Sequence, residues 1–142
     1  MKIIPWRTID RPWLEWTIRD FLETGVARGG DFLATDRNVG LLADLGLQCA
    51  VQGDPCLVAV IDGRLVGWLL WVGMAPVFDS RYKTVNAVGS FTEPYARNKG
   101  VAEALRLAGI QQAKALGYER IIGPVHITNP KGMQVFATVF HA

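Results

Sequence analysis

Residues 93–102 have the sequence Glu93-Pro94-Tyr95-Ala96-Arg97-Asn98-Lys99-Gly100-Val101-Ala102, between a predicted strand and the clearest helical pattern of the chain. A turn that opens a helix exposes backbone N–H groups at the positive end of the helix dipole, a geometry that binds a pyrophosphate. Gly100 and Ala102 are small enough to let phosphates approach the backbone, and Arg97 and Lys99 add positive charge. Charge-assisted hydrogen bonds contribute about 1.5–3 kcal/mol each. The stretch therefore predicts a turn that binds a diphosphate.

The residues on either side of this turn predict a strand, a helix and a second strand. Lys83 to Phe91 alternates as a strand does, and Val101 to Leu116 has the apolar spacing of a helix. Gly117 is suited to end that helix in the left-handed conformation, and Arg120 to Val125 predicts the next strand. Two strands joined through a helix are expected to be parallel.

The first of these strands is expected to have one apolar side that includes a glycine. The residues predicted on that side are Val85, Ala87, Gly89 and Phe91. Glycine inside a strand often marks a bulge or a close approach to a ligand, and we expect one of the two at Gly89.

Upstream, two apolar runs predict an antiparallel hairpin. Cys56 to Ile61 and Leu65 to Val72 are joined by Asp62-Gly63-Arg64, and an Asp-Gly pair between apolar runs favours a tight turn. The second run lacks polar alternation, so we expect it to be covered on both faces. Helices predicted from Pro12 to the Gly29-Gly30 pair, and from about Asn38 to Gln52, would provide cover.

The composition favours one folded domain, residues 1–142, and excludes several classes of protein. Half of the residues are hydrophobic and a fifth are charged, so the chain is not disordered. A net charge of +2 is too close to zero for a protein that binds the phosphates of a nucleic acid duplex. Pro5 and Arg7 break the N-terminal apolar stretch, and the run Leu65 to Phe78 is shorter than a membrane span of about 20 residues. We therefore expect a cytoplasmic protein with no membrane or nucleic acid partner.

The cysteines and histidines do not form a metal-site pattern. Cys49 and Cys56 are the only thiols and have no CxxC spacing, while His126 and His141 lie far from them in the sequence. We expect no metal, and both thiols are predicted to be buried structural groups.

Arg97, Gly100 and Ala102 stand at the fixed positions of the pattern Arg/Gln-x-x-Gly-x-Gly/Ala, and the surrounding elements follow in the matching order. In both respects the chain resembles the GNAT superfamily of N-acetyltransferases, most specifically over Lys83 to Phe140. The resemblance implies an α/β fold with a mixed, mostly antiparallel sheet flanked by helices on both faces. A central strand-helix-strand unit would bind coenzyme A.

The resemblance also implies a ligand and a reaction. Acetyl-CoA would be the co-substrate, with its pyrophosphate on the turn and its pantetheine along the preceding strand, whose N–H groups would polarise the thioester carbonyl. The implied cofactor-binding residues are Ser90, Phe91, Thr92, Arg97, Asn98, Lys99, Gly100, Val101, Ala102, Asn129 and Phe136. The acetyl group would pass to an amine of a small molecule or a protein by direct attack, without an acyl-enzyme.

Two features depart from the family pattern. Relatives have a Tyr seven residues after the Asn of the last helix, where it protonates the leaving thiolate, whereas this chain has Phe136 seven residues after Asn129. The last predicted helix runs from Asn129 to about Val139, and the sequence ends without the further strands that the family usually has. We therefore expect Arg120 to Val125 to be a bare sheet edge, which a second copy or another partner would cover.

The acceptor amine needs a base, and the sequence offers two candidates. Glu93 follows the predicted pantetheine strand and His126 follows the neighbouring one, so either could lie on the acceptor side. The structural alternatives are an exposed loop carboxylate for Glu93 and, for His126, a histidine whose ring nitrogens are hydrogen-bonded and which has no functional role. Four tryptophans are expected to fill the core, although one could wall an acceptor pocket: Trp13, Trp16, Trp68 and Trp71.

The alternative function is a catalytically silent domain of the same fold that binds a partner or serves in an assembly. Phe136 and the missing strands motivate it. A nucleotide-phosphate site on the same turn is disfavoured, because the chain has neither a Gly-Lys-Ser/Thr run nor a GxGxxG signature.

Overall fold

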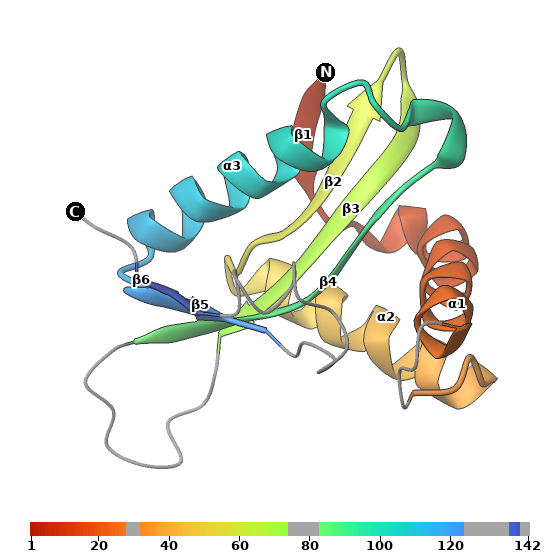
Figure 1. Cartoon of the computed structure of the whole chain (residues 1–142), viewed down its shortest axis with the longest axis horizontal. Coiled ribbons are helices and arrows are strands. Elements are labelled where there is room, and N and C mark those ends of the chain that lie inside the picture. Colours follow the sequence, from red (N-terminus) through yellow and green to blue (C-terminus); the bar gives the residue numbers. More distant parts are fainter. Residues whose placement is uncertain (28–31, 74–82, 124–136, 140–142) are drawn as a thin grey trace.

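A computed structural model describes residues 1–27, 32–73, 83–123 and 137–139 (Figure 1). The elements in chain order are β1 (Lys2–Pro5), the short 3-10 helix η1 (Thr8–Asp10), α1 (Arg11–Ala27), α2 (Asp36–Val51), β2 (Cys56–Ile61), β3 (Arg64–Gly73), β4 (Thr84–Thr92), the 3-10 helix η2 (Pro94–Ala96), α3 (Val101–Ala115), β5 (Arg120–Ile122) and β6 (Ala137–Val139). Every element predicted upstream of residue 124 is present, and β1 is an addition that the sequence did not reveal.

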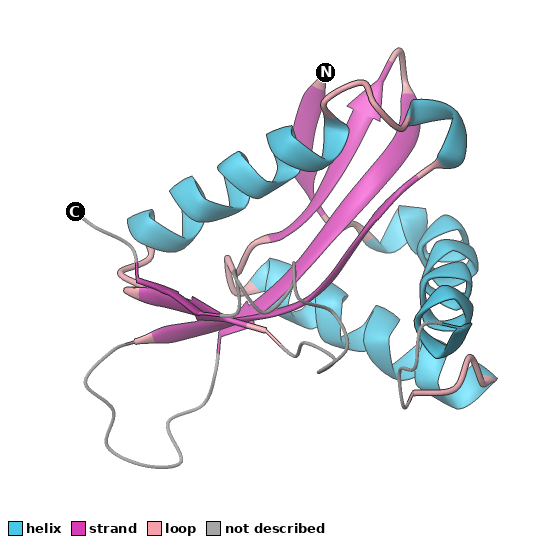
Figure 2. Ribbon diagram, in the orientation of Figure 1, coloured by secondary structure: helices cyan, strands magenta, loops and turns pink. Residues whose placement is uncertain are grey.

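The strands form one sheet of six strands in the order β1-β2-β3-β4-β5-β6 (Figure 2). Neighbouring strands are antiparallel except β4 and β5, which are parallel and joined through α3. The predicted mixed, mostly antiparallel sheet with a central strand-helix-strand unit is therefore confirmed.

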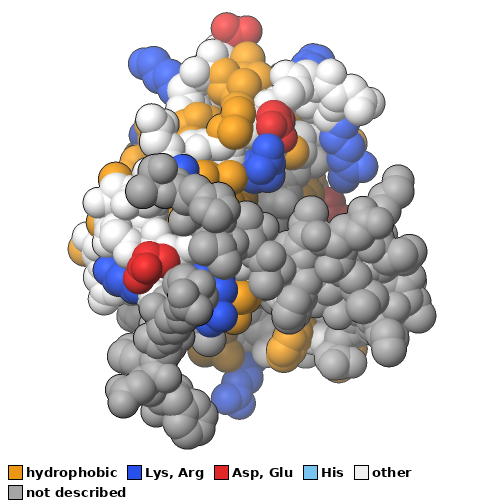
Figure 3. All heavy atoms as spheres, turned by 60° about the vertical axis from the view of Figure 1, so that its left-hand side comes forward, with side chains coloured by type: hydrophobic (Ala, Val, Ile, Leu, Met, Phe, Trp, Pro, Cys, Tyr) orange, Lys and Arg blue, Asp and Glu red, His pale blue; other side chains and the backbone are white. Residues whose placement is uncertain are grey.

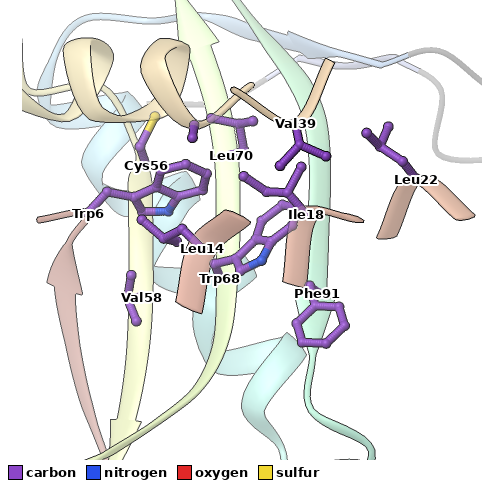
Figure 4. Packing of buried hydrophobic residues seen from close by; sticks show 11 residues of the cluster. Trp6, Leu14, Ile18, Leu22, Val39, Cys56, Val58, Trp68, Leu70 and Phe91 are labelled. Atoms are coloured by element: carbon purple, nitrogen blue, oxygen red, sulfur yellow. The ribbon is translucent and has the colours of Figure 1, made fainter. Parts of the chain in front are cut away.

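Helices cover both faces of the sheet. Helix α3 packs across β2, β3 and β4 on one face, while α1 and α2 pack on the other (Figure 1). Strand β3 contributes to both core layers. Its Trp68 and Leu70 pack on the side of α1 and α2 (Figure 4), whereas Leu69 and Trp71 pack with residues of α3. The predicted double coverage of this strand is confirmed.

The β2–β3 hairpin closes through a two-residue turn. Asp62 and Gly63 both have positive φ, 49° and 76°, and Ile61 pairs directly with Arg64. Two successive left-handed residues define the turn whose twist matches that of paired strands, which is why the Asp-Gly pair predicts it.

Strand β4 contains a bulge that exchanges its faces. Leu70 pairs with Gly89 and Trp71 pairs with Ala87, so Val88 is an extra residue in the register. Val85 and Ala87 consequently pack on the side of α3, whereas Gly89 and Phe91 pack on the side of α1. The sequence-based expectation of one shared side was wrong for this reason, while the bulge predicted at Gly89 is confirmed within one residue.

Helix α1 buries a different face from the one expected. Its buried residues are Leu14, Thr17, Ile18 and Leu22. Trp16 is 64% exposed, so its assignment to the core was wrong, whereas Trp68 and Trp71 are buried and Trp13 is half-buried. Helical spacing fits two adjacent faces of α1, and packing on β3 selects the aliphatic one.

The C-terminal prediction is corrected by β6. Residues 137–139 form a strand that pairs antiparallel with β5, where the sequence predicted the end of a helix. Thr138 and Val139 are β-branched and favour an extended backbone. The edge of β5 is therefore paired, so the expectation of a bare edge was wrong and the reason for a covering partner there disappears.

None of the helices in the described parts of the chain is long and apolar enough to cross a membrane. On the face shown in Figure 3, Lys and Arg side chains lie among Asp and Glu side chains and do not gather in one basic patch.

Candidate functional site

Strands β4 and β5 separate along the sheet. They pair only at Thr84–Asn86 of β4, and Gly123 still lies beside Ala87, where a Cβ on Gly123 would be 3.1 Å from the Ala87 carbonyl oxygen. Beyond that point β4 continues away from β5 (Figure 1), and residues 88–92 have no strand partner on that side among the residues that the structure describes. We call residues 88–92 the open edge of β4.

The open edge presents backbone N–H groups. The N–H of Glu93 donates to the Val66 carbonyl at 2.8 Å and so points toward β3. Backbone N–H groups alternate in direction along a strand, so those of Ser90 and Thr92 point away from β3 and into the gap. The bulge at Val88 bends β4 where β5 leaves it, which explains why the open edge begins there.

The turn after β4 ends in a helix terminus without a side-chain cap. Asn98 and Gly100 have positive φ, 64° and 78°, and the first backbone bond of the helix runs from the Ala104 N–H to the Gly100 carbonyl. Gly100 provides no side-chain cap, so the N–H groups of residues 101–103 have no acceptor within the described chain. A Cβ on Gly100 would meet nothing within 4 Å, so the left-handed backbone is what favours glycine here.

Charge around this helix terminus is predominantly positive. Arg97 Nε donates to the Thr92 carbonyl at 3.3 Å, which holds the guanidinium between the open edge and the turn. Lys99 is exposed and has no ion pair among the described residues. Glu103 in the first turn is bound by Arg106 through two hydrogen bonds of 2.7 and 3.1 Å, which lower the pKa of its carboxyl. Its charge is therefore balanced by a neighbour.

Glu93 lies directly after the open edge and is buried. Only 7% of its surface is exposed, and its Oε1 accepts a hydrogen bond of 3.0 Å from the Trp13 indole on α1. The alternative that Glu93 is an exposed loop carboxylate is therefore wrong. The burial of a carboxyl group beside an open strand edge is a feature that the sequence did not reveal.

A sequence model of the Acetyltransferase (GNAT) family matches residues 13–140 of the chain. The chain belongs to this family. Structural similarity agrees with the sequence match: Ribosomal-protein-alanine N-acetyltransferase from Brucella melitensis has a TM-score of 0.71 at 20% identity, over 94% of this chain and 80% of that one.

Two further GNAT-fold structures are similar at low sequence identity. The PaiA N-acetyltransferase from Thermoplasma acidophilum, solved with coenzyme A, has a TM-score of 0.66 at 17% identity, over 94% of this chain and 84% of that one. An aminoglycoside acetyltransferase from an uncultured soil metagenomic sample, solved with sisomicin, has a TM-score of 0.60 at 18% identity, over 94% and 82% of the two chains. A search of curated proteins found no match.

The GNAT structure separates the predicted site residues into three groups. Ser90, Thr92 and residues 97–102 line the open edge and the turn. The side chains of Phe91 and Val101 are buried in the two core layers, and the Phe91 carbonyl lies against Gly67 of β3, so of these two residues only the backbone N–H of Val101 reaches the site. His126, Asn129 and Phe136 lie outside the described residues, and their roles stay predictions.

The opposite, closed end of the β4–β5 gap is held by Tyr118 and by Asp54, an aspartate that the sequence did not single out. Tyr118 donates to Asp54 Oδ1 at 2.8 Å, and the Gly73 N–H donates to Oδ2 at 3.1 Å. Burial, followed by the bond to Asp54, raises the pKa of Tyr118 to about 12. Tyr118 is therefore engaged at the closed end and does not serve the open edge.

Neither thiol of this GNAT domain is activated. Cys56 is buried and Cys49 is half-buried, and burial is the main cause that raises the pKa of each. The described residues contain no cluster of three His, Cys, Asp or Glu side chains that could hold a metal ion. A hollow of about 320 Å³ between α1 and α2 is lined by Pro12, Glu15, Trp16, Arg19, Asp36 and Val39. None of these residues belongs to the open edge or the turn.

Proposed function

We propose that this GNAT protein transfers the acetyl group of acetyl-CoA to an amine by direct attack. The observation that carries the proposal is the junction of the open edge of β4 with the uncapped N-terminus of α3. Five N–H groups at this junction have no backbone acceptor among the described residues, those of Ser90 and Thr92 and those of residues 101–103.

The unpaired strand edge and the positive charge at this junction support coenzyme A as the ligand. The N–H groups of residues 101–103, with Arg97 and Lys99, would bind the pyrophosphate, because helix N-termini and cations both stabilise phosphate oxygens. An extended pantetheine would lie along residues 88–92 and accept hydrogen bonds from Ser90 and Thr92, as an added strand would. A GNAT-fold neighbour solved with coenzyme A supports this assignment.

Glu93 would act as the base for the acceptor. An amine with a pKa of about 10.4 is mostly protonated at pH 7, and freeing it costs about 4.6 kcal/mol. The ammonium group gives one proton to Glu93, directly or through one water, and the neutral nitrogen attacks the thioester carbon. The C–N bond forms and the C–S bond breaks, and the second proton from nitrogen reaches the thiolate after it has left.

The leaving thiolate would depart without a tyrosine acid. By the resemblance, Phe136 would stand at the position of the family's Tyr, where it could not donate a proton, and Tyr118 is held by Asp54. A thiol with a pKa of about 8.5 leaves unprotonated at pH 7 at a cost of only about 2 kcal/mol. Transfer is therefore expected to proceed more slowly than in relatives with the tyrosine, but to proceed.

The acceptor is an amine of a small molecule or a protein, so the test uses both kinds. Wild-type protein is incubated with radiolabelled acetyl-CoA and sisomicin, polyamines, free amino acids or a peptide with an N-terminal alanine, the first and last being suggested by the structural neighbours. Calorimetry measures the binding of coenzyme A in parallel. Acetylation of any acceptor together with binding supports the proposal, and the absence of both identifies a catalytically silent domain.

A matched pair of variants tests the location of the site. Gly100→Asp places a negative charge at the pyrophosphate and is expected to abolish binding of coenzyme A. Gly117→Asp introduces the same charge at the other end of α3, where the glycine has a similar φ of 84° and an equally open surrounding. Equal affinities in the two variants would contradict the placement.

A further inference from the structure

Trp13 and Glu93 form a contact across 80 positions of the chain. Trp13 lies in the first turns of α1, and its indole Nε1–H donates to Glu93 Oε1 at 3.0 Å. The backbone of Glu93 is fixed independently, because its N–H donates to the Val66 carbonyl at 2.8 Å. Glu93 is therefore held at its backbone by the sheet and at its carboxyl group by a helix.

One carboxylate oxygen of Glu93 stays reachable by solvent. Within the described residues, no buried side-chain oxygen or nitrogen lacks a hydrogen-bond partner. The carboxyl group has one such bond, and it occupies Oε1. No described residue donates to Oε2, so this oxygen retains some contact with solvent even though the residue as a whole is only 7% exposed.

The group that donates to Glu93 is neutral. The other buried acid near the start of a helix, Asp10, has a charged donor instead. Asp10 is bound by the Arg7 guanidinium in an ion pair of 2.7 Å. Glu93 has no ion pair among the described residues. The indole N–H orients the carboxyl group without placing a cation beside it.

We propose that Trp13 is a positioning residue, whose indole N–H fixes Oε1 of Glu93 so that Oε2 takes the proton from the acceptor amine. This inference rests on the proposed function, in which Glu93 is the base. Its physical basis is that a misplaced base lowers the rate of the reaction even when every reacting group is present.

The test removes the N–H and keeps an aromatic, although smaller, side chain. Trp13→Phe is expected to lower kcat by about 10- to 100-fold with the amine that the wild type acetylates fastest. The KM for acetyl-CoA and the affinity for coenzyme A stay unchanged. Trp16→Phe is the matched control, because Trp16 lies on the same helix and is 64% exposed. Its kcat should equal that of the wild type.

A double-mutant cycle identifies the path of the effect. If Trp13 acts through Glu93, adding Trp13→Phe to Glu93→Gln produces no further loss of kcat. A full additional loss in the double variant overturns the proposal, because Trp13 would then act on something else. An active wild type with an unaffected Trp13→Phe variant overturns it equally, and leaves the proposed function intact.

A spectroscopic readout does not depend on turnover. The indole N–H proton signal of Trp13, assigned by its loss in Trp13→Phe, should move in Glu93→Gln because the charged acceptor is replaced by a neutral one. The signal of Trp16 should not move. An unmoved Trp13 signal overturns the proposal. A wild type that acetylates no amine overturns the proposed function, and the role of Trp13 with it, while the signal still reports on the contact.

Discussion

The hydroxyl of Tyr118, just before β5, donates a hydrogen bond of 2.8 Å to Oδ1 of Asp54, in the turn before β2. The same carboxylate accepts the N–H of Gly73 at the end of β3. Three chain segments that are distant in sequence therefore meet on one side chain at the closed end of the β4–β5 gap.

Tyr118→Phe is expected to lower the free energy of unfolding by about 1–2 kcal/mol, since a hydrogen bond to a charged group is lost. Urea unfolding measures the change. Acetyl transfer should be unaffected at temperatures where the variant is folded, because Tyr118 is absent from the open edge. Loss of transfer with unchanged stability would instead place Tyr118 in the chemistry.

Tyr118 also predicts how stability depends on alkaline pH. Its pKa is raised from 10.0 to about 12 in the folded protein. The unfolded chain therefore ionises first, and the stability that this group contributes is complete below pH 10 and lost as pH rises toward 12. Urea unfolding across this window should show a steeper fall for the wild type than for Tyr118→Phe. Parallel curves would contradict the assignment.

Two glycines of α2 are expected to respond in opposite directions to the same substitution. A Cβ on Gly46 would lie 2.2 Å from the Trp6 ring, whereas one on Gly40 would meet nothing within 4 Å. Gly46→Ala should therefore destabilise by about 1–3 kcal/mol through overpacking. Gly40→Ala should stabilise by about 0.5–1 kcal/mol through helix propensity. Urea unfolding of both variants checks the signs, and a stabilised Gly46→Ala would contradict the packing of Trp6.

Lys99 is expected to contribute to coenzyme A binding through its charge. Lys99→Ala should weaken binding about tenfold, which corresponds to one charge-assisted hydrogen bond. Lys114→Ala, in the last turn of the same helix, is the control and should bind as the wild type does. Calorimetry at low and high salt should show the difference shrinking as salt rises. Equal weakening in both variants would indicate a general charge effect.

The sequence predicted those parts of the fold whose signals are local. The Asp62-Gly63 turn, the start of α3 at Val101 and its end before Gly117 each depend on a few neighbouring residues. Parallel pairing of β4 and β5 followed from the connection between them.

The features that sequence analysis missed depend on contacts between distant residues. The exchange of faces at Val88 is defined only by pairing with β3, and the burial of Glu93 requires Trp13 from another layer. The strand at 137–139 was hidden because three residues carry little pattern, and pairing with β5 decides their conformation. The turn of the candidate site was accessible to sequence analysis, whereas the environment of its acid was not.

The separation of β4 from β5 occurs in the middle of the sheet, with β3 on one side and β5 and β6 on the other. Unpaired strand groups at the rim of a sheet invite intermolecular strand exchange and fibril growth. Because β5 pairs with Thr84–Asn86, the open edge of β4 is limited to residues 88–92 in the described chain. An unpaired stretch this short is a poorer template for pairing with another chain than a full-length edge strand would be.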